Sequence, residues 1–321
     1  MNGLGPTLIF ANNAGRPLAE RICDHLSIEL AQARVARFKD NEVDVQLLED
    51  VRGRDVFIVA PTSAPAENLL EAVLLAEAAR SSSAGRVTFV IPYMGYARGD
   101  RKDAPRKPVG IRIALKMLEV SGVNRLIFLD VHAEQSLPCL DAVYDHLYGS
   151  AIAIPELKLL TKGENFVIAS PDRGGVPRAE KYSELLGHGG EIVFFSKTRA
   201  GAGKIKPGSI KIIGDVEGKR VIFPDDIIDS GGTIIADAEA ALEKGAKSVD
   251  VFATHAVFSG DALANLQASP VEHVYVTDSI WHDPAKLAQY PKVAVLSADK
   301  LLANAIRRTH DGESLTKLIP S

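Results

Sequence analysis

The sequence predicts an α/β protein built from two mainly parallel sheets, each flanked by helices. Short β-branched runs alternate with longer helical patterns, and this alternation restarts after Tyr148. Such a rhythm is typical of βαβ units, whose parallel strands are covered on both faces. In the first half, strands and helices are expected in turn at 6–10, 17–30, 56–60, 66–79, 86–93 and 110–120. In the second half, strands are expected at 166–169, 192–195, 220–223, 249–257 and 273–276, with helices at 176–186 and 234–244.

The two halves predict two domains, residues 1–149 and 150–299, each of a common size for a single core. We place the boundary near Gly149 and interpret the apolar stretch 151–160 as a linker. The C-terminal pattern predicts a helix, and the segment 300–321 is expected to pack back on the first domain.

Composition and charge limit the function. The formal net charge of −4 gives no support to a nucleic-acid-binding protein, which usually carries a basic face. The two cysteines, Cys23 and Cys139, lie in no metal-binding spacing, so neither a disulfide framework nor a structural zinc site is expected. The first ten residues lack the pattern of a signal peptide, and no apolar stretch approaches a membrane span. We expect a cytoplasmic protein without membrane association.

A glycine-rich loop follows the strand expected at 220–223. It reads Asp225-Asp226-Ile227-Ile228-Asp229-Ser230-Gly231-Gly232-Thr233 and leads into a helix-forming run. Glycines let backbone N–H groups converge on an anion, and the helix N-terminus adds its dipole. Ser230 and Thr233 add hydroxyl donors. Carboxylates at a strand end suit sugar hydroxyls or a hydrated magnesium ion. The plainer alternative is a turn with a capping residue, which leaves the adjacent acids Asp225 and Asp226 unexplained.

Nine segments resemble the ribose-phosphate pyrophosphokinase family, in the same order along the chain. They are RFKDNE (37–42), VRGRDVFIV (51–59), PYMGYARGDRK (92–102), LDVHAEQ (129–135), SPDRGGVPRA (170–179), FSKTRA (195–200), IGDVEGK (213–219), DDIIDSGGT (225–233) and AIRRTHDGES (305–314). Phosphoribosyltransferases share the DDIIDSGGT loop but would lack most of the other segments. The resemblance therefore favours the pyrophosphokinases.

The resemblance implies two phosphoribosyltransferase-like domains and a magnesium-dependent enzyme. Members of the family convert ribose 5-phosphate and ATP to phosphoribosyl pyrophosphate and AMP, and they form dimers that build hexamers. We therefore expect Mg²⁺ as the cofactor, ATP and ribose 5-phosphate as substrates, and a homo-oligomer. The DDIIDSGGT loop is then the ribose 5-phosphate site, through Asp225, Asp226, Asp229, Ser230, Gly231, Gly232 and Thr233.

Further roles carry over residue by residue. The resemblance implies that three groups of residues handle the nucleotide and the metal. His132 and Asp172 match the residues that hold the magnesium–ATP complex. The loop that grips the ATP phosphates matches Arg98, Asp100, Arg101 and Lys102. The positions that receive the adenine from a neighbouring subunit match Phe38, Asp40 and Glu42, with Phe38 stacking on the adenine.

Plainer interpretations stand beside these roles. His132 can be an ordinary polar residue at a strand end, and Asp172 can cap the following helix. A run of charges such as 98–102 is usually a solvated face. Phe38 can belong to a core. Arg178 is a weaker candidate for the site, with a place on a helix surface as its alternative.

Lys197 and Arg199 match the family's catalytic pair. They stand where the strand expected at 192–195 leads toward the glycine-rich stretch 200–208, which has little to anchor it in a core and is expected to be mobile. Phosphoryl transfer needs positioning and charge neutralisation, so a closing arm with two cations suits the reaction.

The chain departs from the family pattern in several segments. Gly99 replaces a usual Gln in the ATP loop, and Asp50 replaces a Ser before the VRGRDVFIV segment. The stretch 136–140 and the pair Leu315-Thr316 also differ from the family's pattern. The Asp50 carboxylate would repel a bound phosphate. The departing segments serve regulation and subunit contacts in the family, so we expect altered control by phosphate and ADP.

Two other functions compete with the pyrophosphokinase. A non-catalytic regulatory homologue would tend to lose the catalytic or metal-binding groups, yet Lys197, Arg199, His132 and Asp172 are all present. A phosphoribosyltransferase acting on a nucleobase would have no need of the N-terminal motifs.

Overall fold

The chain divides into two compact α/β units, which we describe separately. The computed structural model describes residues 4–199 and 205–320, with the backbone alone at 197–199 and 205–209. Unit 1 comprises the chain up to Tyr148 with Ser279–Trp281 and Ser297–Ile319, and unit 2 comprises Gly149–Asp278 and His282–Leu296. No helix within these described ranges is long and apolar enough to cross a membrane.

Unit 1 has a five-stranded parallel sheet in the order β1-β4-β5-β6-β7. Its strands are β1 (Thr7–Ala11), β4 (Asp55–Val59), β5 (Arg86–Ile91), β6 (Arg125–Leu129) and β7 (Val143–Leu147). An antiparallel hairpin of β2 (Ala33–Arg37) and β3 (Val43–Leu47) stands beside it. The helical segments are α1 (Arg16–Leu26), α2 (Glu67–Ser81), α3 (Gly110–Val120), η1 (Glu134–Cys139), α9 (Asp299–Asp311) and η2 (Leu315–Leu318).

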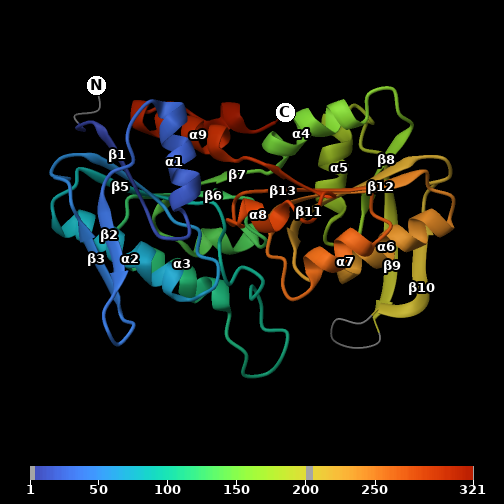
Figure 1. The fold of residues 1–321 in the computed structure, drawn as a ribbon, viewed down its shortest axis with the longest axis horizontal. Helices are drawn as coiled ribbons and strands as arrows, with labels where there is room; N and C mark the ends of the chain where they lie inside the picture. Colours follow the sequence, from blue (N-terminus) through green and yellow to red (C-terminus); the bar gives the residue numbers. More distant parts are fainter. Residues whose placement is uncertain (1–3, 200–204, 321) are drawn as a thin grey trace. The chain divides into compact units, whose positions relative to one another are not determined.

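The helices of unit 1 cover both faces of its sheet. In Figure 1, α1 and α9 lie on one side of the sheet and α2 and α3 on the other. The face toward α2 and α3 is built from alternate strand residues such as Val56, Ile58, Phe89 and Phe128, which are all fully buried. This period of two is the expected pattern for a strand packed on helices.

Unit 2 has a seven-stranded sheet in the order β10-β9-β8-β11-β12-β13-β14. All neighbours are parallel except β10, which pairs antiparallel with β9. Its strands are β8 (Phe166–Ser170), β9 (Ile192–Arg199), β10 (Ile205–Ile213), β11 (Arg220–Ile228), β12 (Ser248–Ala256), β13 (His273–Thr277) and β14 (Val293–Leu296). Its helices are α4 (Ser150–Leu160), α5 (Val176–Leu185), α6 (Gly232–Glu243), α7 (Ala262–Ala268) and α8 (Pro284–Leu287).

The central strand β11 packs on a different helix pair at each face. Ile222 belongs to the core under α4 and α5, whereas Val221 and Phe223 belong to the core under α6 and α7 (Figure 1). The predicted fold class, α/β with mainly parallel sheets and flanking helices, is therefore confirmed in both units. The predicted domains 1–149 and 150–299 stay a prediction. The two units are compact, but compactness does not show that each folds as an independent domain.

Two segments were predicted wrongly. The apolar stretch 151–160 is the helix α4, and its buried residues Ser150, Ala153, Ile154 and Leu157 repeat at helical spacing. In the glycine-rich stretch 200–208, the residues from Ile205 belong to β10 because they continue an antiparallel pairing with β9. The expected mobile loop otherwise falls on 200–204, outside the described residues.

Candidate active site

The predicted ribose-phosphate loop begins inside a strand. β11 continues through Asp225 and Asp226 to Ile228, because Asp225 pairs with Ala253 and Ile228 with Ala256 of β12. A turn follows, and α6 begins at Gly232. Gly231 has a φ of +76°, a left-handed conformation that favours glycine. A Cβ there would also lie 3.2 Å from Leu266.

The N-terminus of α6 presents its first backbone N–H groups without a capping side chain from any described residue. Ser230, Gly232 and Thr233 are exposed around it. Uncapped N–H groups at a helix start, together with the helix dipole, form a ready site for an anion such as phosphate. The segment after β12 holds the turn, since Phe258 N–H donates to Ile228 O at 3.1 Å and Ser259 N–H to Asp229 O at 3.1 Å.

Arg178 on α5 holds the two acids at the end of β11. Its guanidinium lies 3.1 Å from Asp225 Oδ1 and 2.6 Å from Asp226 Oδ1. The side chains are 23%, 25% and 7% exposed, respectively, so the charges are partly withdrawn from water. Burial, with the neighbouring Asp226 carboxylate, raises the pKa of Asp225 above its ordinary value, while Arg178 opposes this rise. The interpretation of Arg178 as a helix surface residue is wrong.

Asp172 follows β8 and holds the turn that precedes α5. Its Oδ1 accepts hydrogen bonds from Gly174 N–H at 2.9 Å and Gly175 N–H at 3.0 Å, directly before the helix. The N-cap residue Gly175 of α5 has no capping side chain among the described residues, so the interpretation of Asp172 as a helix cap is wrong. The residue is exposed, and a carboxylate offers about four acceptor sites, so these two bonds leave room for a cation.

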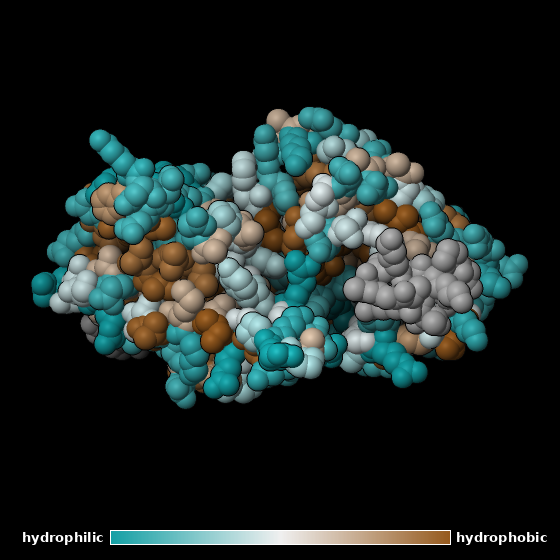
Figure 2. All heavy atoms as spheres, turned by 90° about the horizontal axis from the view of Figure 1, so that it is seen from below, coloured by the Kyte–Doolittle hydropathy of each residue, from teal (hydrophilic) through white to brown (hydrophobic). Residues whose placement is uncertain are grey.

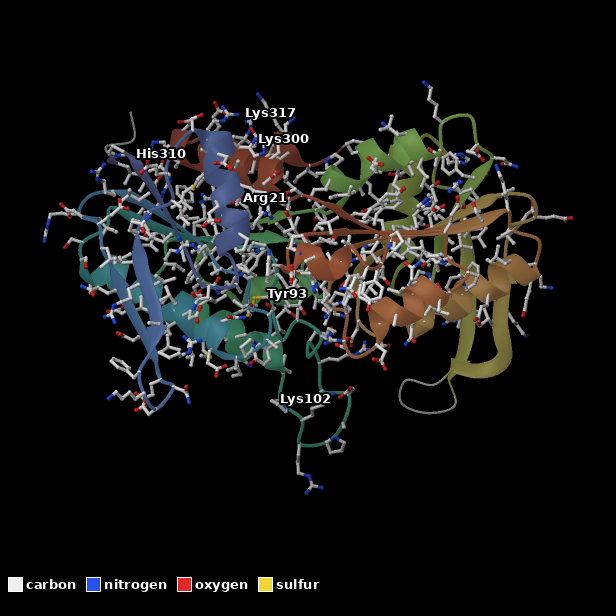
Figure 3. The ribbon with its side chains drawn as sticks, in the orientation of Figure 1. Arg21, Tyr93, Lys102, Lys300, His310 and Lys317 are labelled. Atoms are coloured by element: carbon white, nitrogen blue, oxygen red, sulfur yellow. The ribbon has the colours of Figure 1, made fainter. Side chains whose placement is uncertain are left out.

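Gln135 connects the segment that carries His132 to Asp100 in unit 1. His132 is exposed, three residues beyond Leu129, where β6 ends. Three residues further on, the Gln135 Nε2 donates to Asp100 Oδ2 at 3.2 Å. The structure therefore joins the LDVHAEQ segment to the predicted ATP loop. Arg98, Arg101 and Lys102 are exposed, and Lys102 lies on the loop that projects from the body of unit 1 (Figure 3).

The predicted ATP loop is anchored where it leaves β5. Gly95 N–H donates to Thr62 Oγ1 at 2.8 Å, and a Cβ at Gly95 would lie 2.1 Å from Thr62 O. No larger residue fits without displacing the backbone. Tyr96, next in the chain, has a φ of +62° and is exposed, so the loop is strained at the point from which Arg98 and Asp100 project.

Phe38, Asp40 and Glu42 form the tip of the β2–β3 hairpin. Phe38 N–H donates to Glu42 O at 2.9 Å, and Glu42 N–H donates to Asp40 Oδ1 at 3.1 Å. Phe38 is 54% exposed, so its interpretation as a core residue is wrong. Lys197 and Arg199 lie in β9, opposite Ile210 and Ile205 of β10. Their side chains lie outside the described part of the chain.

Sequence reasoning missed one group of possible metal ligands. Asp250, Glu272 and His273 gather near the starts of β12 and β13, at the edge of the sheet opposite the ends of β8 and β11. Asp250 is fully buried and contacts Arg220 Nη1 at 2.5 Å and His273 Nδ1 at 2.7 Å. Because Arg220 already neutralises Asp250, this cluster suits an ion-pair network better than a cation.

Mg²⁺ prefers oxygen ligands, and proteins usually supply it with one or two carboxylates while the substrate phosphates complete the site. On unit 2, the exposed carboxylate of Asp172 has that chemistry. His132 offers nitrogen, which Mg²⁺ takes less readily than oxygen. The residues present therefore fit a magnesium ion that is held mainly through the nucleotide.

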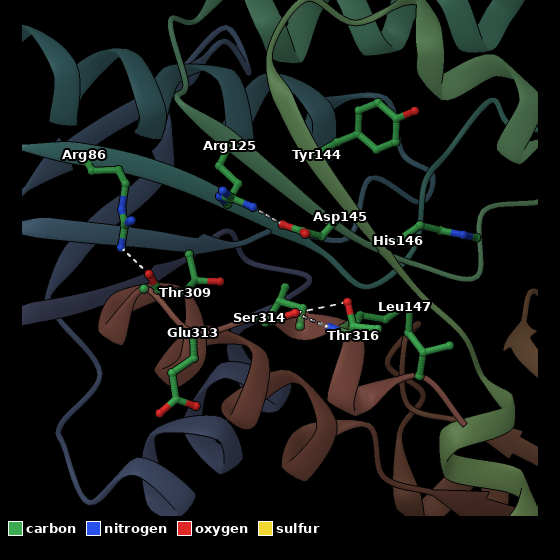
Figure 4. Close-up of a pocket in the computed structure, with 13 residues that line it drawn as sticks. Arg86, Arg125, Tyr144, Asp145, His146, Leu147, Thr309, Glu313, Ser314 and Thr316 are labelled. Carbon is green, nitrogen blue, oxygen red and sulfur yellow. Dashed lines mark hydrogen bonds and ion pairs between the residues drawn. The ribbon is translucent and has the colours of Figure 1, made fainter. Parts of the chain in front are cut away.

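Unit 1 also contains a pocket of about 600 Å³. It is lined by the starts of β5 and β6, by β7, and by the chain that follows α9 (Figure 4). Arg125 pairs with Asp145 in its wall, and Arg86 Nη2 donates to Thr309 O at 2.9 Å. Thr316, which belongs to the pair that departs from the family's sequence pattern, lines the same pocket.

Comparison with known proteins gives consistent matches. Residues 7–122 match the family described as the N-terminal domain of ribose phosphate pyrophosphokinase, and residues 192–320 match the phosphoribosyl synthetase-associated domain. A ribose-phosphate pyrophosphokinase of Vibrio parahaemolyticus is 43% identical over 313 residues, covering 97% of this chain and 98% of that protein. One from Campylobacter jejuni is 42% identical, with the same coverage. The crystal structure of phosphoribosylpyrophosphate synthetase from Mycobacterium smegmatis superposes with a TM-score of 0.89 at 32% identity, covering 96% of this chain and all of that one.

Proposed function

The chain belongs to the ribose-phosphate pyrophosphokinase family and is an enzyme of that class, and we propose that it transfers the pyrophosphoryl group of ATP to the 1-hydroxyl of ribose 5-phosphate. The products are phosphoribosyl pyrophosphate, a precursor for nucleotide biosynthesis, and AMP. The observation that carries the substrate assignment is the uncapped N-terminus of α6, which directly follows the paired carboxylates of β11.

Each part of that loop has a distinct task in binding ribose 5-phosphate. The N–H groups of Gly231, Gly232 and Thr233, with the hydroxyls of Ser230 and Thr233, receive the 5-phosphate. Asp225 and Asp226 accept hydrogen bonds from the ribose hydroxyls, and Arg178 keeps the two carboxylates in place. Asp229 lies between these two halves of the loop.

The nucleotide is bound by residues of unit 1 and of a second copy of the chain. Arg98, Arg101 and Lys102 neutralise the ATP phosphates, and Asp100, held by Gln135, orders the loop. The exposed tip of the hairpin, with Phe38, Asp40 and Glu42, receives the adenine of a neighbouring subunit. Its exposure in a single chain supports a role in such a contact.

Mg²⁺ would be held by the nucleotide phosphates with His132 and Asp172, and it would neutralise charge on the transferring group. Lys197 and Arg199 stabilise the charge that develops as the 1-hydroxyl attacks the β-phosphorus in line and AMP leaves. The strand β9 brings both cations to the start of the 200–204 segment.

One assay tests the activity against the non-catalytic alternative. The protein is incubated with ribose 5-phosphate, ATP and Mg²⁺, and AMP is measured. AMP that forms only with ribose 5-phosphate supports the proposal. No AMP would favour a regulatory homologue. The matches over both halves of the chain already disfavour a phosphoribosyltransferase, whose structure needs no counterpart of residues 7–122.

The catalytic pair is tested by Lys197→Ala. Turnover should fall by about 10² or more, while binding of ribose 5-phosphate stays nearly unchanged, because removing one positioned cation acts mainly on the transition state. Lys211→Ala on β10 is a matched control, since this lysine stands opposite Ser196 in the same strand pair. Equal turnover of Lys197→Ala and the wild type would remove Lys197 from the catalytic pair.

We further propose that the protein is a cytoplasmic homo-oligomer, with dimers as the basic unit. Figure 2 shows hydrophobic side chains gathered on the left-hand part of its view, where α2 and α3 of unit 1 lie in Figure 1. Leu70 and Leu74, one turn apart on α2, are 41% and 38% exposed, and Ile113 on α3 is 59% exposed. Apolar patches of this kind are typical of protein–protein interfaces.

Control by phosphate should differ from the family pattern. Asp50 is exposed and its Oδ1 accepts a hydrogen bond from Arg52 N–H at 3.0 Å, so a negative charge stands beside that arginine. Leu315 and Thr316 lie at the pocket of Figure 4. Activity measured over a phosphate titration tests this, and strong activation by phosphate would refute it.

A further inference from the structure

A buried, strained turn carries His132 beyond the end of β6. β6 ends at Leu129, and Asp130 then has a φ of +47°, a conformation that few residues other than glycine adopt. Asp130 is 7% exposed and Val131 is 4% exposed, so the turn lies inside the protein directly before the exposed His132. A strained conformation of this kind persists only where its surroundings hold it.

The last two residues of β7, His146 and Leu147, hold the turn by accepting hydrogen bonds from its two consecutive backbone N–H groups. Asp130 N–H donates to Leu147 O at 2.8 Å, and Val131 N–H donates to Nε2 of His146 at 2.8 Å. The first bond extends the pairing between the strands. The second depends on a side-chain acceptor, so His146 helps to set the direction in which the chain leaves toward His132.

The ring of His146 must be neutral at Nε2 to accept this hydrogen bond, so its proton lies on Nδ1. Nδ1 is 3.3 Å from Glu134 Oε1, and the Tyr148 hydroxyl donates to the same oxygen at 3.0 Å. Tyr148 also packs edge-on against the imidazole, with 4.7 Å between ring centroids.

We propose that His146 is a positioning residue for the reaction, acting on His132 through the Val131 N–H. This inference rests on the role in binding magnesium–ATP that is proposed above for His132. The turn also leads to Gln135, which bonds Asp100, so its displacement would reach the ATP loop. The ribose 5-phosphate loop belongs to unit 2 and takes part in none of these contacts.

Two substitutions separate the acceptor of His146 from its shape. His146→Gln keeps a carbonyl oxygen at about the reach of Nε2, whereas His146→Leu fills a similar volume without an acceptor. We expect the Leu protein to lose about tenfold in kcat/KM for ATP, the usual effect of one hydrogen bond. The KM for ribose 5-phosphate should stay unchanged, and His146→Gln should restore most of the loss.

Hydrogen exchange at the Val131 amide gives a readout independent of activity. In the Leu protein this amide should exchange about tenfold faster than in the wild type, and in the Gln protein it should be protected again. Normal ATP kinetics in the Leu protein, or a Gln protein as impaired as the Leu protein, would overturn the proposal. Equal losses for both substrates with a lower melting temperature would indicate a purely structural role and would also overturn it.

The result for His132 itself separates this proposal from the proposed function. A fully active His132→Ala protein would remove the role of His132 in binding magnesium–ATP, and the kinetic part of this proposal with it. An inactive His132→Ala protein beside an unaffected His146→Leu protein would overturn the positioning role of His146 alone.

Discussion

The ionised carboxylate of Asp225 lowers the stability of the folded protein. Burial, then Asp226, raises the pKa of Asp225, while the unfolded chain keeps the ordinary value. Between these two pKa values the folded protein binds more protons than the unfolded one, so stability falls as pH rises through this interval. Above the raised pKa the deficit is complete. The contribution of Asp225 is therefore destabilising at high pH and absent below the ordinary aspartate pKa.

We expect Asp225→Asn to raise the thermal midpoint at pH values above this interval by about 2–4 °C, the equivalent of about 1 kcal/mol. The same change should weaken ribose 5-phosphate binding, because an amide offers fewer acceptor sites to the sugar hydroxyls than a carboxylate. Calorimetry at two pH values and a titration with ribose 5-phosphate measure both effects. Asp24→Asn, at an exposed position on α1, is the control and should change neither. A lower midpoint for Asp225→Asn would contradict the argument.

Gly95 and Gly99 form a matched pair in the ATP loop. We expect Gly95→Ala to destabilise the protein by about 1–3 kcal/mol, as overpacking does, and to raise the KM for ATP. A Cβ at Gly95 would lie 2.1 Å from Thr62 O, whereas at Gly99 its nearest neighbour is Tyr96 O at 3.4 Å. Gly99→Ala should therefore leave the free energy of unfolding nearly unchanged in urea titrations. Equal effects of both variants would show that the close approach at Gly95 is unimportant.

The motifs placed Asp172 correctly beyond the end of a strand, because the order of residues around a loop is visible in the sequence. They placed the end of β11 too early, since Asp225 and Asp226 lie within this strand, which continues to Ile228. The contact of Arg178 with both β11 acids was not predictable, since it depends on how α5 packs over β11. His146 gave no signal at all. Its role arises from a contact with a backbone N–H fifteen residues earlier in the chain.

At the scale of elements, charged contacts hold α9 on unit 1. At one end of α9, Asp299 lies 3.3 Å from His25 on α1. At the other end, His310 Nδ1 lies 2.7 Å from Oδ2 of Asp55, which is fully buried and also pairs with Arg86 at 2.5 Å. Arg21 on α1 and His310 are labelled in Figure 3. The contacts at Asp55 are the stronger candidates for stability, because they are shielded from water.

We expect Arg86→Met to cost about 3–5 kcal/mol, since it removes a partner from a buried carboxylate. His25→Ala should cost less than about 1 kcal/mol, because the His25 side chain is 44% exposed and forms an ion pair with Asp299 only when it is protonated. Guanidinium titrations give both values, and limited proteolysis shows whether α9 is released first. A small effect of Arg86→Met would mean that His310 alone satisfies Asp55.

The elements that the sequence predicted best are those with a clear alternation of strand and helix. The helix α4 was taken as a linker because its apolar residues lie all around it, although its buried positions follow helical spacing. The β2–β3 hairpin was not predicted as strands, because its burial is partial on both strands. The two misses therefore have different reasons: α4 is apolar all around, and the hairpin, outside the main sheet, has only weak hydrophobic patterning.

At the scale of the whole molecule, the α/β class followed from a rhythm repeated along the entire chain, whereas assembly leaves no such pattern. The proposed interface rests on exposed apolar side chains such as Leu70, Leu74 and Ile113, which look like core residues in the sequence. Only the fold shows that they reach the surface.

We expect Leu74→Lys to lower the mass of the proposed oligomer in analytical ultracentrifugation, because it places a charge in a patch that would be desolvated.

A mixing experiment tests whether the nucleotide site is shared between subunits. Phe38→Ala and Lys197→Ala proteins should each have little activity, the first lacking the adenine contact and the second the catalytic cation. If Phe38 serves the neighbouring subunit, an equal mixture, dissociated and reassembled, contains sites with both residues intact. In a two-fold dimer, random pairing makes these about a quarter of all sites, so about a quarter of wild-type activity should return. Mixing Phe38→Ala with Arg98→Ala should likewise restore about a quarter, because Phe38 and Arg98 are proposed to reach one site from different chains. No recovery in either mixture would place Phe38 in its own subunit's site.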